Sequence, residues 1–429
     1  MKKWSIFLPL LVLFLWGCGQ GQSNTPKDPV SVVLSAGQVG LELEHLQSLI
    51  EIFNKENPDI KAQIKDYSGV PQQQLDSIQQ VFLAKSSELD VVQIDVIWPG
   101  DLAENLIDLR SLQLEQNLID AHFPATITNN TVDGRLVAMP WFLDAGMMYY
   151  RDDLLQKYGL SVPKTWDELE QTSQFIQDKE RALGNANFWG FVWQAGTGEG
   201  LTCVALELLV SQGAGTIIDA SGSVSINNSR ALEILNRAKS WIGTISPPEV
   251  LTYNGAEGPR KFWETGNALF MRNWPYAFSM GNREESLVKG KFKIAPLPAG
   301  ASGKGASTLG GWQLGINKFS KYPNEALRLL KFLTSERIQR KRAVESGYYP
   351  TIRSLYSDGT LAESSNPIFS QLADVLETTV ARPSTWAAPH YNNFSQLFFT
   401  KIHLILSNSA DAKVVLKELE EELNRLLSL

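Results

Sequence analysis

The sequence predicts an α/β protein built as two lobes, and three observations support this. The chain of 429 residues is too long for one ordinary hydrophobic core. β-branched runs alternate with segments of helical spacing, which indicates a mainly parallel sheet covered by helices. The stretch 134–159 reads as a strand crossing between lobes, with Asp144 set among aromatic residues. Since clefts between lobes usually hold ligands, we expect Asp144 to face one.

The composition narrows the classes of protein that fit. An apolar share of 43% is that of a soluble globular protein. The formal net charge of -7 argues against nucleic acid as the main partner. Twelve tryptophans are a high number for this length, so we expect some of them to line a binding surface while most lie in the core.

The N-terminus is predicted to be a targeting segment. Lys2 and Lys3 precede an apolar stretch at 4–16, which has signal-peptide length and is too short for a comfortable transmembrane helix. It ends in the sequence LWGC at 15–18, which resembles a bacterial lipobox, so Cys18 is predicted to become the lipid-carrying N-terminus. The alternative is an ordinary secretory signal with a chance cysteine. Because Cys203 is the one other cysteine, the lipidated protein would have no internal disulfide.

The first half of the chain alternates between predicted strands and helices. β-branched and alternating runs predict the strands, whereas apolar residues at helical spacing and a leading proline predict the helices. The predicted strands cover 30–36, 60–67 and 90–98, and the predicted helices cover about 46–53 and 71–85. Ligands bind beyond the carboxyl ends of such strands, and Asp95 lies near the end of the third.

The second half continues the alternation. The sequence TWDE at 165–168 predicts a helix that starts with a capping box. Further strands are predicted at 188–193, 267–271 and 291–298, and helices at about 200–212, 229–242 and 260–265. From residue 324 onward the pattern is mostly helical, and it ends in an amphipathic helix around 416–426.

No catalytic or metal-binding signature is present in the sequence. There is no GxSxG, Walker A loop, HExxH or CxxC motif. Histidines occur at positions 45, 122, 390 and 403, without the spacing of metal ligands. We therefore predict no metal, no cofactor and no catalytic residue.

A recurring set of carboxylates, aromatic residues and glycines stands out at the predicted strand ends and lobe crossings. Carboxylates accept hydrogen bonds from paired sugar hydroxyls, arginine donates to sugar oxygens, and tryptophan or tyrosine covers the C–H face of a sugar ring. Each residue alone has a simpler explanation. A glutamate at a helix start interacts favourably with the helix dipole, and a tryptophan is often a core residue. The set comprises Glu42, Glu44, Asp95, Asp144, Trp274, Trp312 and Arg382.

Five ordered segments carry a resemblance to a known family. They are DVVQIDVIW at 90–98, FLDAG at 142–146 with YYR at 149–151, NFWGFVW at 187–193, RNWPY at 272–276 and TLGGW at 308–312. Across nearly the whole mature chain, the sequence resembles the substrate-binding proteins of ABC importers for oligosaccharides, and most closely the trehalose/maltose-binding proteins.

The resemblance implies a two-lobed periplasmic-binding-protein fold of type II-like form, with a hinge between the lobes. It implies sugar-binding roles for Glu42, Asp95, Asp144, Trp274, Tyr276, Gly311, Trp312 and Arg382. Two departures from the family pattern affect contacts to a second sugar unit. Phe142 replaces a tyrosine and so lacks a hydroxyl, and glutamines at 73 and 74 replace paired arginines.

We therefore predict a non-enzymatic, monomeric protein that captures a disaccharide or small glycoside by hinge closure. Trehalose, maltose, sucrose or glucosylglycerol would suit such a pocket, and an ABC permease would receive the ligand. The protein would be exported and lipid-anchored on the periplasmic or extracellular face of the cell membrane. Two alternatives stay open, namely a lipid-anchored glycoside hydrolase that uses Asp95 and Asp144, and a sugar receptor for a sensor.

The predicted organisation assigns every part of the chain. It comprises a signal peptide at 1–18, a polar tether at 19–29, lobe one at 30–138 and 296–335, and lobe two at 139–295 and 336–429.

Overall fold

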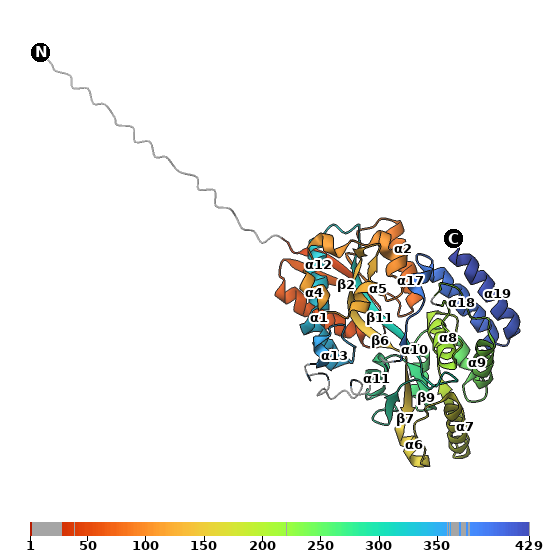
Figure 1. The fold of residues 1–429 in the computed structure, drawn as a ribbon. Helices are drawn as coiled ribbons and strands as arrows, with labels where there is room; N and C mark the ends of the chain where they lie inside the picture. The colour runs from red at the N-terminus through yellow and green to blue at the C-terminus, as the bar shows by residue number, and fades with distance from the viewer. Residues whose placement is uncertain are drawn as a thin grey trace.

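The computed structural model describes residue 1 and residues 28–428, apart from 38, 220, 358, 360, 362–368, 370–374 and 376–377. Residues 2–18 of the predicted signal peptide, including Cys18, and most of the tether lie outside the described residues. Within the described part, no helix has the length and apolar character needed to cross a membrane. Figure 1 shows the two groups of elements, red to orange with light blue on one side and green to dark blue on the other.

The first sheet has the strand order β12-β11-β3-β1-β2, with β6 pairing to β11. β1 runs parallel to β2 and β3, whereas β11 runs antiparallel to both β3 and β6. The strands are β1 (Val30–Ala36), β2 (Ile60–Asp66), β3 (Val91–Asp95), β6 (Ala138–Ala145), β11 (Ser307–Ile316) and β12 (Thr379–Val380).

The predicted parallel arrangement is confirmed for β1, β2 and β3, which pair in parallel, but the whole sheet is mixed because β11 runs antiparallel to β3 and β6. The chain leaves the first sheet at the carboxyl end of β6 and builds the second sheet next. It returns at that same end as β11, so β11 must run in the opposite direction. Hydrophobicity patterns do not encode this reversal.

The second sheet has the order β10-β7-β9-β8 and is also mixed, since β7 is antiparallel to β9 and β10 and β8 is parallel to β9. Its strands are β7 (Met147–Arg151), β8 (Trp189–Val192), β9 (Ala268–Asn273) and β10 (Phe292–Ala295). Only Gly146 separates β6 from β7, so the chain crosses between the sheets there, as predicted for this stretch. The residue bounds proposed for the two lobes stay a prediction.

Helices cover both sheets. Those near the first sheet are α1 (Glu42–Glu56), α2 (Pro71–Leu83), α3 (Pro99–Leu102), α4 (Gln116–Asp120), α5 (Pro124–Asn129), α12 (Pro323–Thr334), α13 (Glu336–Ser346) and α14 (Ser354–Ser357). Short pieces η1 (Ala103–Asn105), η2 (Leu109–Leu112), β4 (Thr131–Val132) and β5 (Arg135–Leu136) connect them. α1 buries the predicted apolar stripe, which includes Leu46, Leu49 and Phe53.

The remaining helices lie around the second sheet. They are α6 (Asp152–Tyr158), α7 (Trp166–Ala182), α8 (Glu199–Gln212), α9 (Ser229–Trp241), α10 (Glu257–Glu264), α11 (Tyr276–Gly281), α17 (Ser384–Ala387), α18 (Tyr391–Leu406) and α19 (Ala412–Leu427), with η3 (Pro248–Thr252) between α9 and α10. The predicted capping box forms, because Thr165 accepts from the Glu168 amide and Glu168 accepts from the Thr165 amide.

A buried ion pair connects β9 of the second sheet to α8 and, through a backbone amide, to β11. On β9, the Nε of Arg272 donates to Glu207 Oε2 on α8 at 2.9 Å, and its Nη2 donates to Glu207 Oε1. Glu207 Oε1 also accepts from the backbone N of Thr308 on β11 at 3.0 Å. Both side chains are almost fully buried, at 1% and 2% exposure. A Cβ at Gly146 would lie 2.1 Å from Glu207 Oε1, so the crossing requires glycine to pass the pair.

Replacing one member of this pair should be costly. Glu207→Gln would leave the Arg272 charge buried without a counter-charge, which typically lowers the free energy of unfolding by about 3–5 kcal/mol. Urea denaturation would measure the loss. The matched control is Glu56→Gln, which removes a carboxylate from an exposed pair with Arg337 and should cost about 0–1 kcal/mol. Equal losses for the two variants would contradict this account.

Candidate functional site

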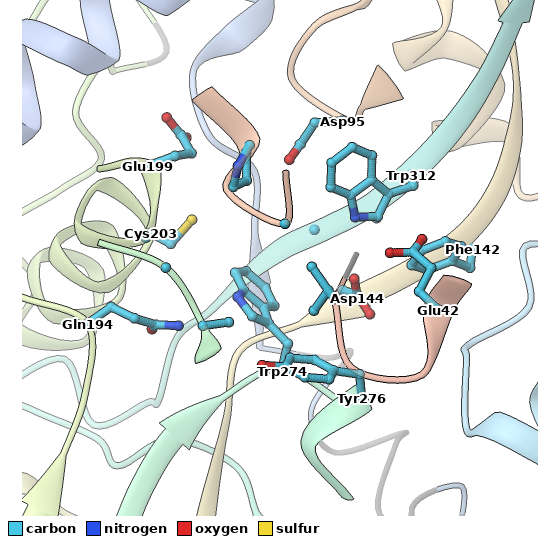
Figure 2. Close-up of a pocket in the computed structure, with 18 of the residues that line it drawn as sticks. Glu42, Asp95, Phe142, Asp144, Gln194, Glu199, Cys203, Trp274, Tyr276 and Trp312 are labelled. Atoms are coloured by element: carbon cyan, nitrogen blue, oxygen red, sulfur yellow. The ribbon is translucent and has the colours of Figure 1, made fainter. Parts of the chain in front are cut away.

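One cavity brings together the eight residues with predicted sugar-binding roles and Phe142, whereas Glu44 of the candidate set is exposed and does not line it. It encloses about 770 Å³, counting the open space at its mouth. Its walls come from both sheets and from the strands that cross between them (Figure 2). The predicted residues that line it are Glu42, Asp95, Phe142, Asp144, Trp274, Tyr276, Gly311, Trp312 and Arg382.

Glu42 lies in the first turn of α1 and is 3% exposed. Its Oε1 accepts a hydrogen bond from Gln93 Nε2 at 2.8 Å, and the Gln93 Oε1 accepts from the Gly37 amide, which fixes the Gln93 side chain. Burial raises the pKa of Glu42 to about 7, although the nearby positive charge of Arg342 acts in the opposite direction. The Val39 backbone amide also donates to this carboxylate, so Glu42 presents a poorly solvated and partly satisfied acceptor at the cavity wall.

Asp144 stands near the end of β6, opposite Gly310 on β11. Burial raises its pKa well above the ordinary value, and the charges of Glu42 and Asp95 add to the rise. Within the described part of the chain, no group donates a hydrogen bond to this carboxylate. Its two oxygens thus have no hydrogen-bond donor from the described residues, and the ligand-binding role of Asp144 stays a prediction.

Arg382 joins two carboxylates from different parts of the fold. Its Nη2 donates to Asp95 Oδ1 at 3.2 Å, and its Nη1 donates to Glu199 Oε1 at 2.9 Å. Asp95 ends β3, whereas Glu199 starts α8. Burial raises the pKa of Asp95 to about 6, and the Arg382 charge opposes the rise. The Arg382 Nε is buried without a hydrogen-bond partner among the described residues.

Two indole rings line the cavity. Trp312 on β11 packs edge-on against Trp98, with ring centroids 5.5 Å apart. The Trp274 ring lies under the Arg272 guanidinium at 4.2 Å and packs over Gly310, where an added Cβ would come within 3.0 Å of it. Figure 2 shows Glu42 and Asp144 on one side of Trp274 and Gln194 on the other. These rings offer flat apolar surface beside hydrogen-bonding groups.

Tyr276 and Gly311 complete the predicted set through close packing. The Tyr276 hydroxyl donates to Glu257 Oε1 at 2.7 Å, so its hydrogen is already used in a bond within the protein. Its ring comes so close to Gly40 that a Cβ there would lie 2.6 Å from it, which brings the loop before α1 against α11. Gly311 has a φ of 133°, and a Cβ on it would lie 2.5 Å from the Phe142 carbonyl oxygen. A side chain does not fit there.

Phe142 contributes ring surface in place of a hydroxyl. It is 3% exposed and packs edge-on against Tyr348 at 4.6 Å. The Arg342 guanidinium lies over both rings, at 4.5 Å from Phe142 and 4.3 Å from Tyr348. Tyr348 also lines the cavity. The glutamines at 73 and 74 do not line it, although Pro71 does.

Several lining residues were not predicted from the sequence. They include Gln194, Glu199, Cys203, Asn254 and Tyr348. Cys203 is buried, as expected, but it faces the cavity and is a free cysteine. The glycine-flanked start of α8 was a possible signal for Glu199, whereas nothing local distinguishes Gln194 or Tyr348. The described residues contain no cluster of acidic, histidine or cysteine side chains suited to a metal ion.

Comparison with known proteins decides the family. Residues 40–340 match the family described as bacterial extracellular solute-binding protein. The chain belongs to this family. It is 46% identical over 349 residues to a probable ABC transporter-binding protein of Deinococcus radiodurans, covering 81% of this chain and 82% of that one. The resemblance identified in the sequence is thereby confirmed.

Solved structures of other solute-binding proteins share the fold. The maltose-bound MalE3 of T. maritima superposes with a TM-score of 0.86 at 38% identity, covering 92% of this chain and all of that one. A solute-binding protein of Thermotoga lettingae, solved with α-D-tagatose, has a TM-score of 0.81 at 22% identity over 94% of this chain and 100% of that one. The predicted two-lobed fold is confirmed, and the family consists of binding proteins, not enzymes.

The raised pKa of Glu42 predicts a pH-dependent stability for the ligand-free protein. Between its ordinary value of 4.5 and about 7, the folded state binds more protons than the unfolded state, so the free energy of unfolding falls as pH rises through this window. We expect Glu42→Gln to remove roughly 1–3 kcal/mol of that fall, since one pKa unit corresponds to about 1.4 kcal/mol.

Urea denaturation of wild type and Glu42→Gln at pH 5 and pH 8 would measure this. Comparing the two proteins cancels the contributions of carboxyls that Glu42 does not perturb, such as Asp95, whereas the part of the Asp144 shift that the Glu42 charge causes is lost together with Glu42. Glu44→Gln changes an exposed residue in the same helical turn and should keep the wild-type pH dependence. A pH dependence that is the same in Glu42→Gln as in wild type would show that burial does not perturb Glu42.

Proposed function

We propose that the protein captures a disaccharide or small glycoside between its lobes and delivers it to an ABC permease. One observation carries the proposal. Two buried carboxylates, Glu42 and Asp144, lie in the same cavity as two indole rings, Trp274 and Trp312. Sugars are the ligand class that needs both, because their hydroxyls donate to carboxylates while their C–H faces pack on aromatic rings.

The charge of the cavity disfavours an anionic ligand. Carboxylates line it at Glu42, Asp95, Asp144 and Glu199, whereas Arg382 is the one cationic side chain among the described lining residues. An anionic solute would face uncompensated repulsion at close range. A neutral polyhydroxylated solute can instead donate to the acidic oxygens. The maltose and tagatose present in the related structures support a sugar of this kind.

Closure of the two lobes is the proposed binding mechanism. Groups from both sheets surround the cavity, so a bound solute contacts both lobes at once. Two sets of contacts suit a closed arrangement of the lobes. Tyr276 packs against Gly40, and Arg382 bridges Asp95 and Glu199. The ligand would stabilise the closed form through its preferential contacts with it.

The geometry disfavours the glycoside hydrolase considered above. Its candidate pair was Asp95 and Asp144, but Asp95 is engaged by Arg382 and by the Ile97 amide at 3.3 Å. A carboxylate held in this way is poorly placed to act as a free acid or nucleophile. A sugar receptor for a sensor stays an alternative, since capture is common to both functions.

A sugar panel tests the proposed function. Thermal shift with trehalose, maltose, sucrose, glucosylglycerol and glucose should identify a ligand, because one present at about 100 times its Kd adds about 2.7 kcal/mol of stability. Asp144→Asn should weaken that ligand by about 1.5–3 kcal/mol in isothermal titration, because one acceptor oxygen becomes a donor. Glu44→Gln, the same carboxylate-to-amide change at an exposed position, is the control. Stabilisation by a cationic solute and by none of the sugars would contradict the proposal, as would sugar turnover.

We also propose that Cys18 anchors the protein to the membrane by a lipid. The proposal rests on the lipobox-like LWGC at 15–18 after a charged and apolar leader. Cys18→Ser should move the protein from the membrane fraction to the soluble fraction of the producing cell. A variant that stays with membranes after a salt wash would contradict lipidation.

A further inference from the structure

Gln194 presents a buried hydrogen-bond donor to the cavity. The residue follows β8, is fully buried and lines the cavity wall. Its Oε1 accepts from Arg272 Nη1 at 3.1 Å. Its Nε2 has no hydrogen-bond partner among the described residues. An unpaired buried N–H costs free energy, so this group is suited to meet an acceptor supplied by a ligand.

The orientation of this amide follows from its neighbour. A guanidinium can only donate hydrogen bonds, so the amide oxygen must face Arg272 and the amide nitrogen must face away. Arg272 is itself fixed by Glu207 and by the Trp274 ring. If the amide were flipped, the Gln194 NH2 group would face the N–H groups of Arg272. The Gln194 Nε2 is therefore held in its orientation before any ligand binds.

Space is available beside this donor. Gly200, Cys203, Gly255 and Ala256 line the cavity with small side chains or none. A Cβ on Gly200 would lie 3.3 Å from the Gln194 Cβ, which is tighter than most real contacts, so a larger residue at 200 would crowd Gln194. In Figure 2, Cys203 lies between Gln194 and Glu199, on the side of Trp274 away from Glu42 and Asp144. The cavity thus continues past the indole ring.

We propose that Gln194 determines specificity for a two-unit sugar by donating from Nε2 to an oxygen of the second unit. This inference rests on the proposed function and deepens it. The first unit binds at the acceptor end, where Glu42 and Asp144 take its hydroxyl protons. The second unit lies past Trp274, where a hydroxyl, ring or glycosidic oxygen accepts from Gln194. A monosaccharide at the acceptor end leaves Nε2 unpaired, so it gains nothing from this residue.

Two substitutions at Gln194 test this proposal. Gln194→Glu keeps an acceptor for Arg272 and replaces the free donor, and Gln194→Met keeps the length without polar atoms. Isothermal titration with maltose, trehalose and sucrose, and with glucose as the one-unit probe, would compare them with wild type. We expect both variants to weaken the best disaccharide at least tenfold and to change glucose affinity less than twofold. Gln212→Glu is the control, because Gln212 is nearly buried in the same lobe but does not line the cavity.

The outcomes separate this inference from the proposed function. If wild type binds none of the sugars, the proposed function fails. If wild type binds a disaccharide and the Gln194 variants bind it equally well, or lose glucose to the same extent, the inference alone is overturned. If the variants do not fold, titration of wild type with singly deoxygenated forms of the disaccharide replaces them. Loss of at least tenfold on removal of one second-unit oxygen supports the donor, and uniform affinity across the series overturns it.

Discussion

The buried pair of Glu207 and Arg272 is the interaction on which the ligand cavity depends. It connects α8 to β9, and it reaches β11 through the Thr308 amide. Arg272 also supports the Trp274 ring from behind and orients the Gln194 amide. A buried ion pair adds little net stability compared with apolar residues of the same volume, because desolvation offsets the attraction. Its contribution here is geometric, since it holds an aromatic wall, an amide and a crossing strand in fixed relation.

The cavity combines acidic groups that are individually unfavourable. Burial raises the pKa values of Glu42, Asp95 and Asp144, which means that their charged forms lack the solvation that water would provide. Gln93 and Arg382 satisfy part of this demand. The remaining acceptor capacity is fixed in position before a ligand arrives, and such preorganisation lowers the entropy lost on binding. Ligand hydroxyls would then supply the missing donors.

The sequence located most residues of the cavity wall and the parallel strands β1 to β3, but not the direction of β11. Asp95, Asp144 and Trp274 lie in short segments at strand ends, where local patterns and family resemblance are both informative. The direction of β11 depends on where the chain re-enters the sheet, which no local pattern records. The bond between Arg382 and Glu199 joins residues 183 positions apart, so spacing could not reveal that Arg382 serves protein carboxylates as well as the cavity. Gln194 was not predicted for a similar reason, because the orientation of its amide depends on the hydrogen bond from Arg272.

The paired strands β6 and β11 carry a mechanical consequence. Asp144 and Gly310 face each other on this two-stranded ribbon at the point where the chain passes between the sheets. If the lobes rotate about the ribbon, atoms close to the rotation axis travel least, while Trp274 and Tyr276, carried beyond it, travel along longer arcs. A solute could therefore dock against Asp144 while the molecule is still open, in nearly the place that it keeps at the end. The contacts at the axis would govern capture, and those on the long arcs would govern how slowly the solute escapes.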